Sequence, residues 1–348
     1  MSASITDVRN ALTMISRVPF NAEAPPAALA GEVTPTALHY VRSNFPFPVH
    51  DGSFTIGGAV GTPMTLTLDD LRSMPASERT VTLECAGNGR LGQSPLPAGE
   101  PWGRFAVSTA RWRGVPLHLV LRQAAPAPDG LEVAFRGADH GRYARHEDIA
   151  FVRSLPLSHA GDPAADILIA YDMNSEPLTT EHGAPFRLIV PGWYGMASVK
   201  WLSRIDVLTD RYKGEFQTHH YMYHRDGSSE PVTLMRVRAR ITDPAPSSAI
   251  QAGTYRVRGK AWSGAGPVTN VDVSFTGEGE WYPTELEPPR GPYHWQDWSF
   301  EWRSVTVGRH SLRARATDAA GHTQPEVPPW NRLGYGNNAV ELQYVDVY

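Results

Sequence analysis

The sequence predicts an α+β domain followed by an immunoglobulin-like β-sandwich. Three observations favour this fold class. The length of 348 residues suits one large domain and one smaller one. Up to about residue 230, strand-like apolar runs alternate with short helix-compatible segments, and beyond it short alternating strands follow one another between Gly and Pro turns. The 30 Pro and 31 Gly are typical of a chain rich in loops and strands.

The first part of the chain has two sections. Residues 1–34 are expected to form an arm on the surface, because they contain the Pro- and Ala-rich run "NAEAPPAALAGEVTP". In residues 35–230 we expect a short helix with Asp69 and Asp70 in its first turn, followed by the strand "ERTVTLEC". Further on, "VPLHLVLRQA" predicts a helix, and strands are predicted in "LEVAFRGAD", "ADILIAYDMNSEPLTTEHGAPFRLIVPG" and "VKWLSRIDVL".

Residues 235–348 form the predicted sandwich. After the breaker "HRDGSSEPVT", strands are expected in "TYRVRGKAW", "VTNVDVSF", "WSFEWRSV" and "GRHSLRARATD", and "NNAVELQYVDVY" is expected to hold the last strand. The chain has a single cysteine, so this sandwich lacks the disulfide of antibody domains.

Composition excludes several classes of partner. A formal net charge of −4 gives no general attraction to nucleic acid or to anionic membranes. No run approaches the roughly 18 apolar residues of a membrane span, and the first residues lack the apolar core of a signal peptide and a twin-arginine pair. We therefore expect no nucleic-acid partner, no membrane insertion and a cytoplasmic location.

The only cysteine, Cys85, lies in "VTLECAGNGRLG". A lone cysteine is most often a buried small hydrophobe, but this one ends a strand and precedes a glycine turn, where sites are commonly built. Arg90 and the backbone N–H groups of the turn would stabilise its thiolate.

Three readings of Cys85 are open at this point. As a nucleophile it would pair with a histidine from "GADHG" or "TEHGAP" in a Cys/His hydrolase. As an inert core residue it would belong to a non-enzymatic binding protein. As a metal ligand it cannot alone build a structural zinc or iron–sulfur site, but it can give one bond to a metal held mainly by an organic cofactor.

Five segments, in order, resemble the sulfite oxidase family. "LECAGNGR" is similar to that family's molybdenum-binding cysteine motif, and the others are similar to its pterin-binding segments: "YVRSNFPFP", "STARWRGVPL", "ILIAYDMNSEPLTTEHGAPFRLIVPG" and "ASVKWLSRI". The family also has a C-terminal immunoglobulin-like dimerisation domain. The resemblance therefore implies a haem-free molybdoenzyme with a molybdopterin-binding catalytic domain at 35–230 and a homodimer formed through 235–348.

The resemblance implies a role for individual residues. Cys85 would supply the one protein thiolate to molybdenum, and soft thiolate ligands tune redox metals. Because molybdopterin ends in a phosphate, arginine and amide donors suit its pocket. The implied molybdopterin contacts are Tyr40, Val41, Arg42, Ser43, Asn44, Asp139, His182, Arg187, Ser198, Val199 and Lys200.

The substrate pocket would adjoin the metal. By the same resemblance, Arg42 and Arg90 would bind an oxyanion, Trp102 would form a wall and Tyr221 would hydrogen-bond the anion. The implied reaction is oxygen-atom transfer that converts sulfite to sulfate, and reduction of a sulfoxide, an N-oxide or nitrate is the alternative. "HHYMYH" also permits a zinc site, to which we give little weight because no nearby acid or cysteine completes it.

The sequence departs from the family at two points. It contains no His-Pro-Gly-Gly haem element, so we expect electrons to pass to an external acceptor such as a cytochrome or oxygen. Near the C-terminus, Val340 and Glu341 stand where the family commonly has Trp and a basic residue that reaches the anion pocket. Arg332 is our candidate replacement for that charge.

Overall fold

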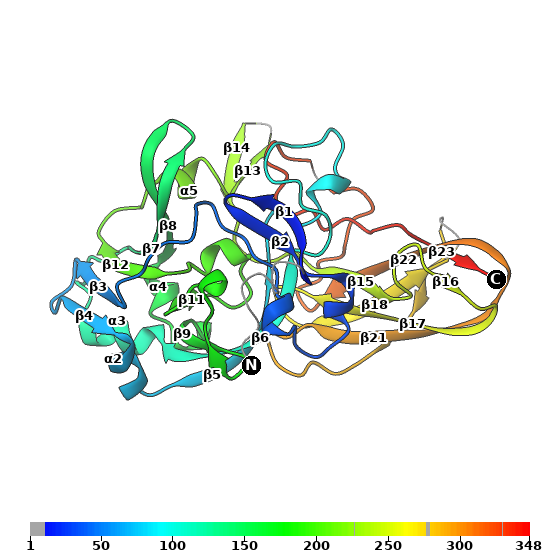
Figure 1. Ribbon diagram of the computed structural model, residues 1–348, viewed down its shortest axis with the longest axis horizontal. Coiled ribbons are helices and arrows are strands. Elements are labelled where there is room, and N and C mark those ends of the chain that lie inside the picture. The colour runs from blue at the N-terminus through cyan, green and yellow to red at the C-terminus, as the bar shows by residue number, and fades with distance from the viewer. Residues whose placement is uncertain (1–10, 226, 276–278, 329) are drawn as a thin grey trace.

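The computed structural model describes residues 11–225, 227–275, 279–328 and 330–348, so the first ten residues of the predicted arm lie outside the described residues. Figure 1 shows a mixed domain at the left and a β-sandwich at the right, with the hairpin β1–β2 between their upper parts. The two parts correspond to the predicted fold class, which is confirmed.

One sheet of the mixed domain carries the predicted cysteine strand. It has the order β10-β9-β6-β5, with β11 paired to β9, and all of its pairings are antiparallel. Its strands are β5 (Ser77–Glu84), β6 (Val107–Pro116), β9 (Leu168–Met173), β10 (Glu176–Pro177) and β11 (Arg187–Ile189). Cys85 follows directly after β5, at the strand end that the sequence predicted.

The second sheet has the order β4-β3-β12-β7-β8, with one parallel pairing between β12 and β3. Its strands are β3 (Ser53–Gly58), β4 (Met64–Thr67), β7 (Glu132–Tyr143), β8 (His146–Pro156) and β12 (Leu202–Leu208). The two sheets share one hydrophobic core, since Val107 of β6 and Ile169 of β9 cluster with Phe54 of β3, Phe135 of β7 and Ile205 of β12.

Short helices connect these strands. Thr67 caps α2 (Leu68–Ser73) in a reciprocal capping box with Asp70, which explains the acidic first turn. The apolar face of α3 (Leu117–Ala124) belongs to the shared core. The remaining helices are α4 (Leu157–Ala160), α5 (Glu215–Thr218), η1 (Pro26–Leu29), η2 (Thr36–Leu38), η3 (Arg90–Gly92), η4 (Pro163–Ala165), η5 (Thr180–His182) and η6 (Gly195–Ala197).

The C-terminal part is a sandwich of two sheets. One contains β15 (Arg238–Asp243), β17 (Gly253–Trp262), β20 (Glu285–Leu286) and β21 (Gln296–Val305). The other contains β16 (Ala249–Ile250), β18 (Val268–Ser274), β19 (Tyr282–Pro283), β22 (Gly308–Asp318) and β23 (Gln343–Val347). Alternate residues face a separate core, in which Val257 and Trp298 of the first sheet meet Val271, Leu312 and Val345 of the second.

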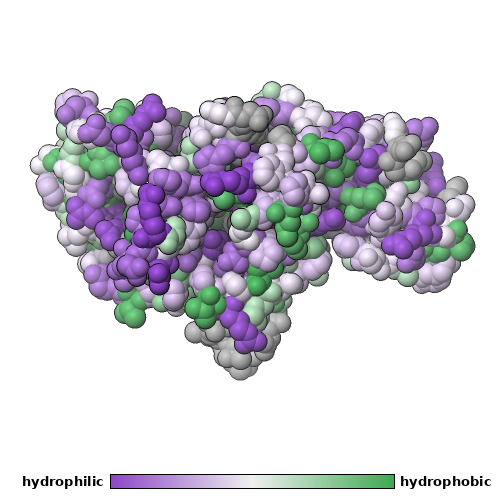
Figure 2. All heavy atoms as spheres, turned by 90° about the horizontal axis from the view of Figure 1, so that it is seen from above, coloured by the Kyte–Doolittle hydropathy of each residue, from purple (hydrophilic) through white to green (hydrophobic). Residues whose placement is uncertain are grey.

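Two hairpins lie outside these sheets. The first, β1 (Thr13–Arg17) and β2 (Phe20–Glu23), belongs to the predicted surface arm, yet all four residues of β2 are buried. The second is β13 (Met222–Arg225) with β14 (Ser228–Pro231). Among the described residues no helix is long and apolar enough to cross a membrane. On the face shown in Figure 2 hydrophobic residues form scattered small groups among hydrophilic ones.

Gly114 of β6 provides a test of the sheet packing. A Cβ atom there would lie 2.1 Å from the Ile169 carbonyl oxygen and 2.5 Å from the Ala170 Cα atom. We expect Gly114→Ala to lower the free energy of unfolding by about 1–3 kcal/mol, because backbone must move to make room. Urea unfolding followed by tryptophan fluorescence would measure the loss.

The matched control is Gly61→Ala, whose added Cβ would lie 3.5 Å from the Ala125 Cβ atom, an ordinary contact. Equal stability of the two variants would contradict the close approach of β6 and β9.

Candidate active site

Cys85 lies on a wall shared by two cavities, each of which it lines. Its amide donates to the Ala106 carbonyl at 2.8 Å and its own carbonyl accepts from the Asn88 amide at 2.9 Å, so its backbone is fixed from two sides. Gly89 turns the chain with a left-handed φ of 81°. Burial raises the pKa of the Cys85 thiol, and the nearby Arg42 guanidinium opposes this effect.

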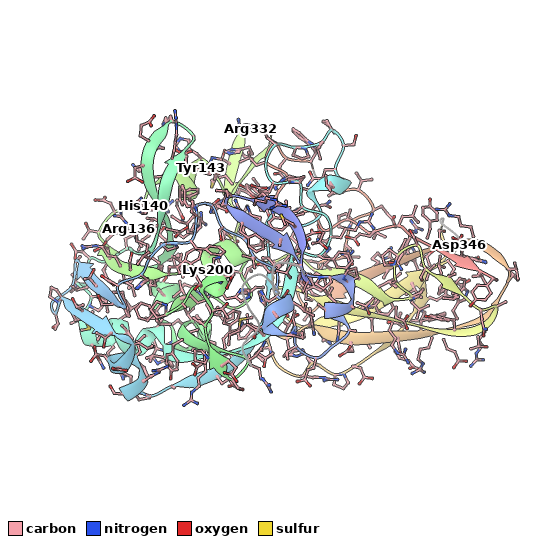
Figure 3. All side chains as sticks on the ribbon, viewed as in Figure 1. Arg136, His140, Tyr143, Lys200, Arg332 and Asp346 are labelled. Atoms are coloured by element: carbon pink, nitrogen blue, oxygen red, sulfur yellow. The ribbon has the colours of Figure 1, made fainter. Side chains whose placement is uncertain are left out.

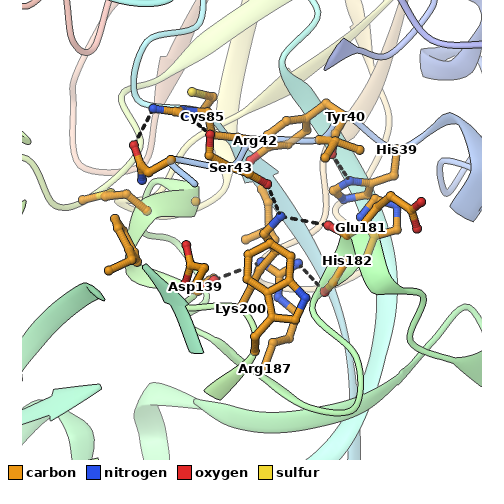
Figure 4. Close-up of a pocket in the computed structure, with 18 of the residues that line it drawn as sticks. His39, Tyr40, Arg42, Ser43, Cys85, Asp139, Glu181, His182, Arg187 and Lys200 are labelled. Atoms are coloured by element: carbon orange, nitrogen blue, oxygen red, sulfur yellow. Dashed lines mark hydrogen bonds between the residues drawn. The ribbon is translucent and has the colours of Figure 1, made fainter. Parts of the chain in front are cut away.

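The first cavity is called the cation-lined cavity here because basic side chains line it (Figure 4). It collects nearly all of the predicted molybdopterin contacts: Tyr40, Val41, Arg42, Ser43, Asn44, Asp139, His182, Arg187, Ser198 and Lys200. Val199 differs from the rest, since its side chain is 1% exposed and packs in the hydrophobic core.

Lys200 is a half-buried basic residue in this cavity. Its Nζ atom donates to Ser43 Oγ at 3.0 Å and to the Glu181 carbonyl at 2.8 Å, and it lies 4.1 Å from the centre of the Trp201 ring. Burial and the neighbouring Arg187 hold the pKa of Lys200 well below its ordinary value. An anion in the cavity would restore the charged form of this lysine.

Arg187 and two histidines form the adjoining wall. The Arg187 guanidinium donates to the carbonyls of His182 and Ser198, at 3.0 Å each, and burial lowers its pKa to about 10. Burial lowers the pKa of His39 to about 3 and that of His182 well below its ordinary value, so both rings are neutral. Among the described residues, His39 Nε2 and Arg187 Nε are buried without a hydrogen-bond partner.

Asp139 supplies an acidic side chain on the opposite side of the cavity (Figure 4). It is 4% exposed, and burial raises its pKa to about 7 although Lys200 and Arg42 oppose the shift. Gly137 allows this approach, because a Cβ atom there would lie 2.3 Å from Asp139 Oδ1.

The second cavity, called the aromatic cavity here, lies on the other side of Cys85. All four residues predicted for the substrate pocket, Arg42, Arg90, Trp102 and Tyr221, line it. Tyr143, His220 and Tyr335 also line it, and the Tyr221 and Tyr335 rings stack with centroids 5.2 Å apart. Figure 3 shows Tyr143 toward the upper edge of the molecule and Lys200 nearer its centre.

Two arginines bring positive charge to the aromatic cavity. Arg90 donates to the Leu333 carbonyl from Nε (3.1 Å) and Nη2 (2.9 Å) and to the Glu100 carbonyl from Nη1 (2.5 Å). Arg42 donates to Asn21, Asn44 and the Ser43 carbonyl. These hydrogen bonds fix the orientation of both guanidinium groups. Each guanidinium has five N–H groups, so N–H groups beyond those used in these bonds can donate to an oxyanion.

Several residues that line the two cavities were not predicted from the sequence. His39 and Glu181 directly adjoin predicted residues, so the motifs "HYVRSN" and "TEHGAP" carried a signal for them. Tyr143 and Tyr335 had no such signal, because they come from the end of β7 and from a C-terminal loop that only the folded chain brings to Cys85.

The C-terminal residues do not supply the expected basic group. Glu341 is paired with Arg238 and Arg240, with 3.3 Å between its Oε2 atom and Arg240 Nη1. Arg332 is exposed, and neither it, Val340 nor Glu341 is among the residues that line the two cavities. Among the described residues that line the aromatic cavity, the arginines are Arg42, Arg90 and the exposed Arg142.

The other readings of the sequence find little support in the described part of the chain. It contains no group of three or more His, Cys, Asp and Glu side chains placed to hold a metal ion, so the histidines of "HHYMYH" form no zinc site there. It also contains no hydrogen bond between Cys85 Sγ and a histidine ring, which a Cys/His nucleophile would need.

Similarity to known proteins decides the family. The model described as "Oxidoreductase molybdopterin binding domain" matches residues 44–216, and "Mo-co oxidoreductase dimerisation domain" matches 229–343. Sulfite oxidase of Gallus gallus is 35% identical over 93% of this chain and 75% of its own length. The chain belongs to the sulfite oxidase family. These matches confirm the prediction of a molybdopterin-dependent oxidoreductase.

Other members of the family cover the chain to different extents. Mitochondrial sulfite oxidase of Mus musculus is 34% identical over 97% of the chain, which spans 66% of that protein's length. Inducible nitrate reductase [NADH] 2 of Glycine max is 33% identical over 92% of the chain and 40% of its own length. The solved structure of the sulfane dehydrogenase SoxCD from Paracoccus pantotrophus is 27% identical, with a TM-score of 0.85 over 99% of this chain and 90% of that one.

The residues present fit the molybdenum cofactor of the family. The basic side chains of Arg42, Arg187 and Lys200 line the cavity and are suited to a phosphate, and the unpartnered nitrogens of His39 and Arg187 are suited to polar atoms of a pterin. Cys85 places one soft thiol at the edge of the same cavity, as a ligand to molybdenum requires.

Lys200→Met tests the charge that the cavity offers to the cofactor. We expect molybdenum retention to weaken on the order of ten- to a hundredfold, because a charge-assisted hydrogen bond contributes about 1.5–3 kcal/mol. The cofactor-free variant should be no less stable, since burial disfavours the charged form of Lys200. Molybdenum per protomer by elemental analysis would show the loss, and exposed Lys213→Met is the control. Equal retention in both variants would remove Lys200 from the cofactor site.

Asp139 predicts a pH dependence of the cofactor-free protein. Its pKa is raised from an ordinary 3.8 to about 7, so over that interval the folded chain keeps a proton that the unfolded chain has lost. The free energy of unfolding contributed by Asp139 therefore falls as the pH rises from about 4 to 7. Asp139→Asn should remove this contribution in urea titrations, whereas exposed Asp129→Asn should not. Parallel pH profiles for wild type and Asp139→Asn would contradict the shift.

Proposed function

We propose that this protein oxidises sulfite to sulfate by oxygen-atom transfer and passes the electrons to an external acceptor. The observation that carries the proposal is the position of Cys85, on the wall between a cation-lined cavity and a cavity with two arginines. When bound, the molybdenum cofactor supplies the transferable oxygen and takes up the electron pair. The protein contributes the thiolate ligand, the cofactor cradle and the anion site.

The proposed roles of the residues that line the aromatic cavity follow from their charge and burial. Arg42 and Arg90 bind the oxyanion through guanidinium groups whose orientation is fixed by hydrogen bonds to the protein. Trp102 is 1% exposed and closes one wall, and Tyr221, 6% exposed, presents a phenol to the same space. Fixed donors in a site shielded from water stabilise developing charge without reorganising. No side chain has to act as a general base in this scheme.

The choice of sulfite rests on the relatives. The sulfite oxidases of Mus musculus and Gallus gallus are 34% and 35% identical to this chain over 97% and 93% of its length. Reduction of nitrate is the second candidate, because a relative named nitrate reductase is 33% identical over 92% of the chain. Sulfane sulfur is a further substrate to test, because the solved structure similar over 99% of the chain is named a sulfane dehydrogenase.

The partners and location belong to the same proposal. The matched dimerisation domain supports a homodimer formed through residues 235–348. The acceptor is proposed to be a cytochrome or oxygen, and the cytoplasmic location is proposed from the sequence alone. Light scattering at micromolar concentration would detect the dimer.

Cys85→Ser tests the metal ligand. We expect turnover with sulfite to be lost, because serine cannot replace a soft thiolate as ligand to the metal, while the thermal unfolding temperature changes little. Sulfite-dependent reduction of ferricyanide and of cytochrome c would be measured together with molybdenum content. Arg332→Gln, which changes an exposed side chain outside both cavities, is the control and should keep kcat/KM within about twofold.

The outcomes separate the candidates. Turnover with sulfite that disappears in Cys85→Ser supports the proposal. Molybdenum without sulfite turnover, but with reduction of nitrate by a dye donor or oxidation of a sulfane compound, would replace sulfite as substrate. Full sulfite turnover in Cys85→Ser would overturn the role of Cys85.

A further inference from the structure

The residue before the metal ligand is held by the sandwich domain. Glu84 is 2% exposed and its carboxylate accepts three hydrogen bonds. Asn88 Nδ2 donates at 2.8 Å from within the cysteine loop, whereas Arg238 Nη1 and Trp262 Nε1 donate at 2.9 Å each from the paired strands β15 and β17. A side chain at the end of β5 is therefore fixed by two residues more than 150 positions away along the chain.

The same domain also contacts the residues after Cys85. The Gly336 amide donates to the Ala86 carbonyl at 2.7 Å, and Asn337 Nδ2 donates to the Gly89 carbonyl at 2.7 Å. Arg238 Nη1 links the two sets of contacts, since it also donates to the Asn337 carbonyl at 2.9 Å. The loop on either side of Cys85 is thus attached to the C-terminal domain.

The contact is charged and buried. Arg238 is 1% exposed and pairs with Glu84 on one side and Glu341 on the other, and Glu341 pairs in turn with Arg240. Although burial opposes it, Arg240 and Arg238 hold the pKa of Glu341 below its ordinary value. The carboxylates of Glu84 and Glu341 and the guanidiniums of Arg238 and Arg240 therefore compensate one another in one cluster, and the partly exposed Arg104 lies at its edge, with 3.9 Å between Arg104 Nη1 and Glu341 Oε2. Removing one member leaves an uncompensated charge close to Cys85.

We infer that Arg238 and Glu84 are positioning residues for the metal ligand, through which the C-terminal domain orients Cys85 and sets the charge beside the redox centre. The inference rests on the proposed role of Cys85 as ligand to molybdenum. Groups behind a ligand commonly orient it and tune the metal, and here one such group comes from the domain matched as a dimerisation domain. The sandwich therefore has a part in the chemistry of its own subunit.

The charge argument predicts opposite effects for the two residues. Arg238→Met leaves the Glu84 carboxylate without its cation, and added negative charge disfavours electron uptake, so the reduction potential of molybdenum should become more negative. Glu84→Gln keeps the shape of the side chain but leaves Arg238 less compensated, so the potential should become more positive. The double variant Glu84→Gln/Arg238→Met should return toward the wild-type value.

The experiment is a redox titration of the molybdenum-loaded protein, followed by the Mo(V) electron paramagnetic resonance signal. Arg303→Met is the matched control, because Arg303 forms an exposed ion pair with Glu301 in the same domain. Trp262→Phe removes a hydrogen bond to Glu84 but no charge, so its potential should stay near wild type. Molybdenum content and thermal unfolding identify any variant that fails to fold. If Arg238→Met fails to fold, the reduction potential of Glu84→Gln, a substitution that conserves volume, provides the test.

The outcomes are distinguishable. Shifts of opposite sign in Glu84→Gln and Arg238→Met, with compensation in the double variant, support the inference. Unchanged potentials, or shifts of the same sign, in variants that retain molybdenum would overturn it and leave the proposed function standing. Absence of molybdenum from wild type prepared in a competent host would overturn the proposed function itself.

Discussion

The structure depends on one electrostatic constraint: three basic side chains, the buried Arg187 and the half-buried Arg42 and Lys200, line a single cavity. The lining residues offer them the carboxylates of Asp139 and Glu181, and burial favours the protonated form of Asp139. Such a cavity is costly to keep without a further anion. A bound phosphate-containing cofactor relieves that cost, so cofactor binding and stability of the catalytic domain are linked.

The two domains are less separate than their sequences indicate. The hydrophobic core of the catalytic domain includes Trp262, Trp295 and Tyr335, which come from the C-terminal part of the chain, while the sandwich keeps a second core around Trp298. Tyr335 also lines the aromatic cavity and stacks on Tyr221. The C-terminal residues thus complete the core, the substrate cavity and the support of Cys85 together.

Periodicity in the sequence predicted the strand before Cys85, helix α3 and the sandwich. The family resemblance supplied molybdopterin contacts of which all but Val199 line the cation-lined cavity, whereas other lining residues, among them Phe151 and Met196, were not predicted. The sequence did not reveal β8, whose segment "HEDIAFVRSLP" is largely polar where it is exposed. Nor did it reveal that Val199 packs in the core, that Glu84 is buried, or that Glu341 pairs with two arginines. A glutamate in a sequence indicates an exposed charge unless its partner is known, and here the partner, Arg238, is distant in the chain.

At Glu341 the chain differs from the family pattern without placing an acidic group in the aromatic cavity. An acidic residue replaces the basic one suggested by the family pattern, and its carboxylate is turned to Arg238 and Arg240. The cluster neutralises Glu341, so it does not repel an anion near Cys85. The aromatic cavity then relies on two arginines held by backbone carbonyls and asparagines, with stacked aromatic rings around them. A few donors of fixed direction therefore line the aromatic cavity, and such donors suit the small oxyanion proposed as substrate.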